Sequence, residues 1–380
     1  MGTPFWQLTR STQCDEGMLL MYKGILLGHP LMAQCHKFIT RHKPLNHKQW
    51  LQRIAQVPEI DQQIDFYNSG PTITLLENKI AELLGKERAL FVHKGMVGQN
   101  AALLQWSANL NRHRIAIHPQ SHIAVDESDA YDKLLNLEVW MFGEPHCAIT
   151  DNDIARLPED LAAIVLELPT RRAGFRLPQW QTLEYLQQFA KTRGIPIHID
   201  GARLLEAACY WQKPYADVAG IGNSVYVSLY KTLGAAAGGV VAGETEFIEQ
   251  LIPWRSRMGG DLFTAFPYVL SALWGLRHYL PRIPEFHQRA YALAQAIQHR
   301  FGDEALPFPV QCNGFLVQLP VSAQVLERRA LKLAEEKGIW LFDRILPQGE
   351  QSCRFEIQAG DALDDWQDAD LVDLLEQLSR

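Results

Sequence analysis

The alternation of helical and strand periods from about residue 70 onward constrains the fold of this chain most strongly. Apolar residues recur at helical spacing from Ile73 to Leu84, and a short apolar run follows at 89–93. The alternation continues through further strand candidates at 114–118, 137–142, 162–168, 195–199, 224–229 and 238–243. Because parallel strands need long crossover connections, usually helices, the pattern predicts an α/β fold with a mostly parallel seven-stranded sheet covered by helices.

The pattern changes after about residue 281. A helix at 286–300 is followed by a strand at 314–319, a helix at 323–337, strands at 339–342 and 353–357, and a last amphipathic helix. We therefore expect a large domain at 65–280 and a smaller α+β C-terminal domain at 281–380.

Residues 1–64 form a separate N-terminal segment, which we expect to be helical and locally basic. Between residues 20 and 60 six Lys and Arg side chains stand against one acid, Glu59, and four histidines occur, namely His29, His36, His42 and His47. We interpret this stretch as a solvated helical cap.

Charge and hydropathy exclude several partners of a 380-residue chain. The net charge is −7, which disfavours nucleic acid because phosphate binding needs a basic face. No apolar run reaches the length of a membrane helix, and the N-terminus shows no signal-sequence pattern. Six dispersed cysteines form no C-x-x-C pair, which indicates reduced thiols and a cytoplasmic location: Cys14, Cys35, Cys147, Cys209, Cys312 and Cys353.

Groups that carry chemistry follow five of the predicted strands. They are Lys94, Gly95 and Met96 after 89–93, His122 after 114–118, Arg171 and Arg172 after 162–168, Asp200 and Arg203 after 195–199, and Lys231 after 224–229. In open α/β sheets ligands bind beyond the carboxyl ends of the strands. Together these groups can hold a phosphate, stack on a ring, bind a carboxylate, pair with a ring nitrogen and supply an amine. That set is typical of pyridoxal phosphate enzymes.

Lys231 and Asp200 are the centre of this hypothesis. Lys231 precedes a run of small residues at 234–239, and burial at the sheet edge would lower its pKa and make it a nucleophile. Asp200 ends an apolar run and, if buried, needs a partner such as a protonated pyridine nitrogen. The alternatives are a surface lysine and a structural Asp200–Arg203 ion pair. The turn at 95–98 would open a helix whose N–H groups attract phosphate, although a plain turn is an alternative.

Two other kinds of site are disfavoured. His113, His118 and His122 lie close in sequence, but no cysteine or H-E-x-x-H spacing accompanies them, so we expect no zinc or other metal, and His122 alone could be a structural histidine. A nicotinamide oxidoreductase would need G-x-G-x-x-G after a strand, which the chain lacks in that context.

These motifs resemble those of the threonine aldolases, in the β-eliminating lyase group of fold-type I pyridoxal phosphate enzymes. The strongest match is HIDGARL at 198–204 followed by SLYKTLG at 228–234, and looser matches are YNSGPTITLLE at 67–77, FVHKGMVGQN at 91–100 and SHI at 121–123. The resemblance implies that Lys231 carries the cofactor, Asp200 pairs with its ring nitrogen and His122 stacks on its ring.

The resemblance also implies roles for the remaining residues. Arg172 and Arg354 align with arginines that bind the substrate carboxylate, and Gly95 and Met96 offer backbone donors to the phosphate, to which Lys94 adds charge. Independently of the resemblance, Arg203 is a candidate to orient Asp200. Departures from the family pattern are Lys94 and Met96 in place of hydroxyl residues, Tyr230 in place of a serine, Thr170 in place of a histidine and Phe263 in place of a basic residue.

The implied activity is cleavage of a threonine-like β-hydroxy-α-amino acid to glycine and an aldehyde, with His122, or a water that it holds, as the base. Another activity on the same cofactor, such as β-elimination, transamination or racemisation, remains an alternative, and so does a non-catalytic binding protein that uses residues 20–60. The resemblance further implies a homodimer or homotetramer, in which Tyr67 and the arginines near Arg257 are candidates to reach the neighbouring subunit's cofactor.

Overall fold

A seven-stranded sheet forms the centre of the larger unit in the computed structural model, which describes residues 26–380. The strand order is β2-β8-β7-β6-β5-β3-β4, and only β8 runs against its neighbours. The bounds are β2 Arg88–Val92, β3 Arg114–Ile117, β4 Glu138–Met141, β5 Leu161–Glu167, β6 Ile197–Asp200, β7 Ser224–Ser228 and β8 Gly239–Gly243. The predicted mostly parallel seven-stranded sheet is therefore confirmed. The predictions about Cys14 and a signal sequence lie outside the described residues.

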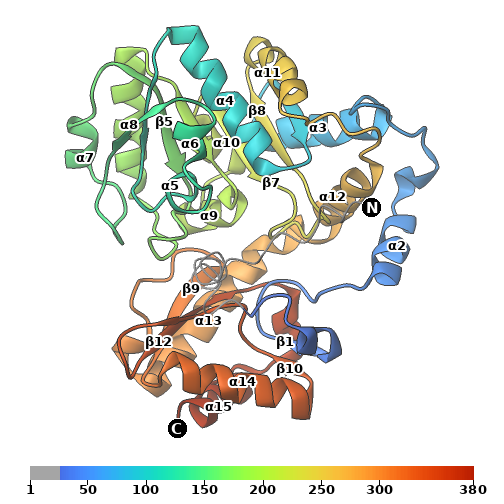
Figure 1. Cartoon of the computed structure of the whole chain (residues 1–380), viewed down its shortest axis with the longest axis vertical. Coiled ribbons are helices and arrows are strands. Elements are labelled where there is room, and N and C mark those ends of the chain that lie inside the picture. The colour runs from blue at the N-terminus through green and yellow to red at the C-terminus, as the bar shows by residue number, and fades with distance from the viewer. Residues whose placement is uncertain (1–25) are drawn as a thin grey trace, which may run out of the picture.

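Helices cover both faces of this sheet (Figure 1). They are α3 Pro71–Leu84, α4 Gly95–Leu110, α5 His122–Val125, α6 Ala130–Lys133, α7 Asp151–Ala155, α8 Trp180–Arg193, α9 Leu204–Trp211, α10 Tyr215–Gly220, α11 Thr245–Arg257 and α12 Phe266–His278. Alternate residues of a strand point to opposite faces. In β2, Phe91 packs in the cluster that includes α3, α8 and α12, whereas Leu90 and Val92 pack in the one that includes α4 and α11.

The smaller C-terminal unit contains an antiparallel sheet of order β11-β12-β9, drawn in orange and red in Figure 1. Its elements are α13 Ile283–Phe301, β9 Gly314–Leu319, α14 Ala323–Lys337, β10 Ile339–Trp340, β11 Ile345–Pro347, β12 Cys353–Gln358 and α15 Asp368–Ser379, with short 3-10 turns η3 Leu280–Arg282, η4 Asp303–Ala305 and η5 Asp361–Asp365. This agrees with the predicted α+β fold. No helix within 26–380 has the length and apolar character needed to cross a bilayer.

The beginning of the described chain packs on this C-terminal unit. After η1 (Pro30–Gln34), strand β1 (Lys37–Phe38) pairs in parallel with β10, and Phe38, Ile39 and Thr40 are buried. The chain then passes α2 (His47–Ala55) and η2 (Pro58–Asp61) on its way to α3, as the blue trace in Figure 1 shows. The interpretation as a solvated cap is wrong for residues 38–40, because their side chains join a core that only the C-terminal half completes.

Helix α12 supports the turn that carries Lys231. Gly275 of α12 lies so close to the Leu233 carbonyl that an added Cβ would overlap its oxygen atom. Because overpacking of this kind typically costs about 1–3 kcal/mol, we predict that Gly275→Ala lowers the free energy of unfolding by that amount in urea titrations. In the matched control Gly220→Ala, an added Cβ meets no atom within 4 Å, so stability should stay unchanged or rise slightly. Equal losses for both variants would contradict the packing argument.

Candidate active site

One cavity at the carboxyl edge of the sheet brings six of the predicted site residues together. They are Lys94, Gly95, Met96, His122, Asp200 and Lys231. The same cavity is also lined by Gln99, Glu127, Ala202, Tyr226, Ser228 and Tyr230. It is narrow, with a volume of about 20 Å³. The rule that groups following parallel strands meet at one edge therefore holds for four strand ends of this sheet.

Lys231 lies in the turn after β7 and points its ammonium group into a largely desolvated space. Burial and the nearby Arg203 guanidinium lower the pKa of this amine, Asp200 and Glu167 act in the opposite direction, and the net pKa is about 7. A lysine with a pKa near neutrality has a substantial unprotonated fraction and can act as a nucleophile.

Asp200 is the last residue of β6, and only 2% of its surface is exposed. Its Oδ1 accepts a hydrogen bond from the backbone N–H of Ala202 at 3.2 Å. No Lys, Arg or His nitrogen within the described residues forms an ion pair with it. A buried carboxylate without a cationic partner fits a ligand that brings a positive charge or a strong donor.

The first turn of α4 forms the opposite wall of this cavity. The helix is 16 residues long, its residues Gly95 and Met96 line the cavity, and Lys94, at its N-cap position, makes no side-chain capping bond. The Tyr226 hydroxyl lies against Gly95, where an added Cβ would overlap it. Such a helix start can hold a phosphate.

His122 is held in place by two glutamates that the motif analysis did not single out. Its Nε2 lies 3.0 Å from Glu127 Oε1, and its backbone N–H donates to Glu167 Oε2 at 2.8 Å. Glu167 is the last residue of β5, and burial together with the nearby Asp200 charge raises its pKa. Glu167 lies at the end of a strand, as Asp200 does, so strand position in the sequence points to both residues. No sequence signal points to Glu127.

A second cavity, of about 210 Å³, lies on the other side of Lys231, and Tyr230 and Lys231 line both cavities. Its charged and polar lining comes from Arg41, His42, Arg171, Arg203, Thr232, Asn313 and Gln358. Arg203 is 9% exposed, and one of its terminal nitrogens donates to Gln358 Oε1 at 3.1 Å. Its buried Nε has no partner among residues 26–380. This cavity therefore offers an unused buried donor beside the reactive lysine.

Arg172 and Arg354 lie outside the linings of both cavities. The guanidinium of Arg172 pairs with Asp126, its Nε donating to Oδ2 at 2.9 Å. The Nε of Arg354 donates to Gln318 Oε1 at 2.7 Å, on a part of β12 distant from Gln358. By contrast, Arg171 lines the larger cavity and its Nε donates to Glu356 Oε1 at 2.7 Å.

A buried chain of hydrogen bonds supports Gln99 behind Asp200. Trp106 Nε1 donates to Ser224 Oγ at 2.9 Å, which lies 2.8 Å from His198 Nδ1, and His198 Nε2 lies 2.9 Å from Gln99 Oε1. Burial lowers the pKa of His198 to about 4, so the ring is neutral at pH 7. The serine therefore donates to Nδ1, and Nε2–H donates to Gln99.

His118 and His122 are not part of any metal-binding group of three ligands within the described range.

These residues fit pyridoxal phosphate. The unpaired buried carboxylate of Asp200 suits a protonated pyridine nitrogen, the open start of α4 suits the phosphate, and the desolvated Lys231 suits the aldehyde. Tyr230 and Lys231 line both the narrow cavity and the larger one beside it.

The lowered pKa of Lys231 gives a test that needs no cofactor. Between pH 7 and about 10.4, the Lys231 amine holds fewer protons in the folded chain than in the unfolded chain. Because only the unprotonated amine is acylated, the acylation rate of Lys231 in the folded protein should rise around pH 7 rather than around pH 10.4. Competitive labelling with acetic anhydride and peptide mass spectrometry measure that midpoint. Glu167→Gln should move the midpoint lower, because it removes a nearby negative charge. A midpoint near that of the exposed Lys191 would contradict the assignment.

Comparisons with known proteins agree with this geometry. Residues 53–319 match the family model described as β-eliminating lyase. The chain is 27% identical over 298 residues to low-specificity L-threonine aldolase 1 of Arabidopsis thaliana, covering 74% of this chain and 81% of that protein. It is 25% identical over 255 residues to the low specificity L-threonine aldolase of Escherichia coli K12, covering 63% and 73%. The structure of a candidate L-allo-threonine aldolase from Listeria monocytogenes EGD-E superposes with a TM-score of 0.84 at 30% identity, covering 92% and 98%.

Proposed function

This chain belongs to the β-eliminating lyase family of fold-type I pyridoxal phosphate enzymes, and on that premise we propose that it cleaves a threonine-like β-hydroxy-α-amino acid to glycine and an aldehyde. The observation that carries the proposal is the meeting of Lys231, Asp200, His122 and the start of α4 in one cavity. Pyridoxal phosphate, when bound, supplies an electron sink for the electrons of a bond broken at the amino acid Cα.

In this proposal Lys231 carries the cofactor and Asp200 faces its ring nitrogen. The start of α4 at Gly95 and Met96, with the nearby ammonium group of Lys94, holds the phosphate. His122 lies against the ring, and Arg203 stays beside Lys231 in the adjoining cavity. These roles are supported by the shared lining of the two cavities and by the burial of Asp200 and Arg203.

We assign the substrate carboxylate to Arg203 and Arg171 rather than to Arg172 and Arg354. Arg203 has a buried Nε without a partner in the part of the chain that the structure describes, and Arg171, which pairs with Glu356, lines the same cavity. The other two arginines, paired with Asp126 and Gln318, do not line it. A guanidinium gives a carboxylate a charge-assisted contact with defined geometry. Holding the carboxylate fixes which bond at Cα faces the electron sink.

His122 is our candidate for the group that takes the proton from the substrate β-hydroxyl, directly or through a water. Glu127 holds its Nε2 and Glu167 holds its backbone N–H, so the ring has a fixed orientation in the cavity. General bases typically contribute about 10²–10⁴-fold to a rate. Thr170 is an unsuitable substitute, because its hydroxyl is buried and donates to the Glu167 carbonyl.

The experiment is incubation of the cofactor-loaded protein with threonine, allo-threonine and phenylserine, followed by assay of glycine and aldehyde. We expect both products from at least one substrate. Pyruvate with ammonia would instead favour β-elimination, an amino form of the cofactor would favour transamination, and exchange of the Cα configuration would favour racemisation. Cofactor binding without turnover of an amino-acid panel would favour a binding protein.

We also propose that the chain assembles as a homo-oligomer and acts in the cytoplasm. An exposed aromatic cluster near the first turn of α4, made of Phe66, Tyr67 and Phe263, supports assembly, because its ring centroids lie 5.4–5.7 Å apart and its members are 47–63% exposed. The free thiols of the described cysteines support the location. Sedimentation of an active monomer would overturn the assembly.

A further inference from the structure

We propose that His42 is a positioning residue for Lys231: it clamps the turn 231–234 onto the C-terminal unit and so fixes where the lysine amine points. His42 lies in the histidine-containing segment near the start of the chain, upstream of residues 53–319 that match the family. The effect of His42 on catalysis rests on the proposed function, whereas its effect on the position of Lys231 does not.

The turn that carries Lys231 is closed by two backbone hydrogen bonds, from Gly234 N–H to the Lys231 carbonyl and from Ala235 N–H to the Leu229 carbonyl, each 2.9 Å long. Gly234 has a φ of +62°, a conformation that favours glycine, and an added Cβ there would meet the rings of Tyr279 and His42. The turn therefore lies directly against these two rings, and its position depends on theirs.

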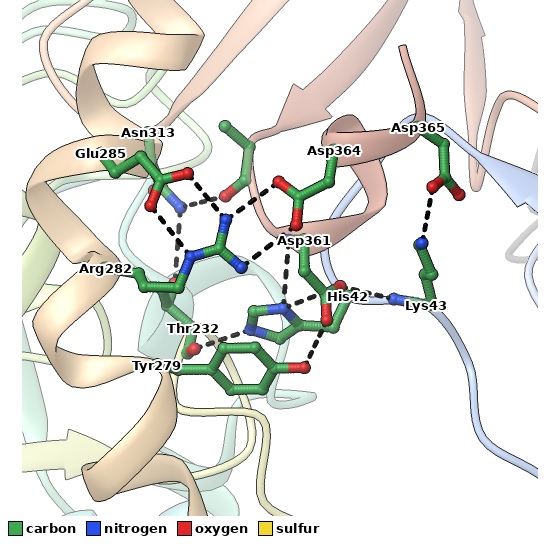
Figure 2. A network of polar contacts seen from close by, with 11 residues as sticks. His42, Lys43, Thr232, Tyr279, Arg282, Glu285, Asn313, Asp361, Asp364 and Asp365 are labelled. Atoms are coloured by element: carbon green, nitrogen blue, oxygen red, sulfur yellow. Dashed lines mark hydrogen bonds and ion pairs between the residues drawn. The ribbon is translucent and has the colours of Figure 1, made fainter.

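His42 makes one of the polar contacts that hold this turn; in another, the Thr232 hydroxyl donates to Glu206 Oε1. The Nε2 of His42 lies 2.7 Å from the Thr232 carbonyl oxygen, one residue after the lysine, so Nε2 carries the proton and donates (Figure 2). The ring stacks on Tyr279 with centroids 3.7 Å apart and an interplanar angle of 11°. Figure 2 also shows Asn313, whose Nδ2 lies 3.4 Å from the hydroxyl oxygen of Thr232.

The other ring nitrogen anchors His42 to η5 of the C-terminal unit. Its Nδ1 lies 3.3 Å from Asp361 Oδ1 and 3.4 Å from the Asp361 backbone nitrogen. Asp361 also accepts the Tyr279 hydroxyl and the backbone N–H of Lys43. A protonated Nδ1 donates to the carboxylate, and an unprotonated Nδ1 accepts the backbone N–H. In both states Nε2 keeps its proton and its contact with Thr232.

Because both nitrogens are engaged and one face is stacked, His42 has no free atom to exchange protons with a substrate, although its ring lines the larger cavity beside Lys231. It acts through Thr232. Loss of the donor would release the turn, let water reach the Lys231 amine and raise the pKa of that amine toward its ordinary value. A misplaced reactive group can also cost up to about 100-fold in rate.

The test is competitive acylation of Lys231 in cofactor-free protein, in wild type, His42→Ala, His42→Gln and the control His29→Ala. We expect His42→Ala to move the midpoint upward by about one pH unit and so to slow labelling at pH 7 about fivefold. His42→Gln, whose amide can still donate to Thr232, and His42→Ala with added imidazole should approach wild type. His29 belongs to the same segment but stacks on Trp340, so His29→Ala should have no effect.

Circular dichroism at each pH confirms that the labelled protein is folded. A wild-type midpoint retained in folded His42→Ala, or an equal shift in His29→Ala, would overturn the positioning role. Because the labelling needs neither cofactor nor substrate, it tests the positioning role separately from the proposed function. The proposed function is overturned by a different result, namely that the wild-type chain binds no pyridoxal phosphate.

Discussion

Lys231→Ala should reduce turnover by a factor on the order of 10⁴ or more, because no other described lysine lines the cavity except Lys94 at the phosphate end. Among the lysines that the structure describes, the substitution removes the one amine that is both desolvated and adjacent to Asp200. Cofactor should still enter the cavity by its contacts with the start of α4 and Asp200, but without covalent attachment. Steady-state assays with the best substrate and an absorbance spectrum of the dialysed protein measure both effects.

The matched control is Lys191→Ala in α8, an exposed lysine that lines neither cavity. Its activity and spectrum should match those of wild type. If Lys231→Ala kept a tenth or more of wild-type turnover, the assignment of the reactive amine would be wrong.

Asp200→Asn should weaken cofactor binding about 10- to 100-fold and lower turnover as well. The carboxylate can form a charge-assisted contact with a protonated ring nitrogen, worth roughly 1.5–3 kcal/mol, and the neutral amide cannot. Because each 1.4 kcal/mol corresponds to about tenfold in an equilibrium constant, the loss converts to that range. Fluorescence titration of the cofactor-free protein with pyridoxal phosphate measures the dissociation constant.

Asp217→Asn in α10 provides the control, because Asp217 is exposed and outside the cavity linings. Its dissociation constant should equal that of wild type. An Asp200→Asn variant that binds the cofactor as tightly as wild type would show that Asp200 serves a structural purpose instead.

The sheet could be predicted from the sequence because its strands are short apolar runs that are buried on both faces. All seven residues of β5 are buried, so its composition alone marks it as a core strand. Strands β1 and β11 could not be predicted in the same way. They are two and three residues long, which is too short to show a strand period, and β1 pairs with β10, a strand that is distant in the sequence.

The candidate site could be predicted where a strand end alone decides position, as for Asp200 after β6 and Lys231 after β7. The direction in which a side chain points could not be predicted. Arg171 and Arg172 are neighbours in the sequence, yet Arg171 lines the larger cavity, whereas Arg172 pairs with Asp126 outside that cavity. The role of His42 also could not be predicted from the sequence, because His42 lies 190 positions before Thr232, whose carbonyl it contacts.

The measurement that tests the central claim most directly is borohydride reduction of the protein loaded with pyridoxal phosphate, followed by peptide mass mapping. Covalent attachment of the cofactor to an amine is made permanent by the reduction. The account predicts that the added mass lies on Lys231 and disappears in Lys231→Ala. Attachment at another lysine as the main product, or no attachment at all, would contradict it.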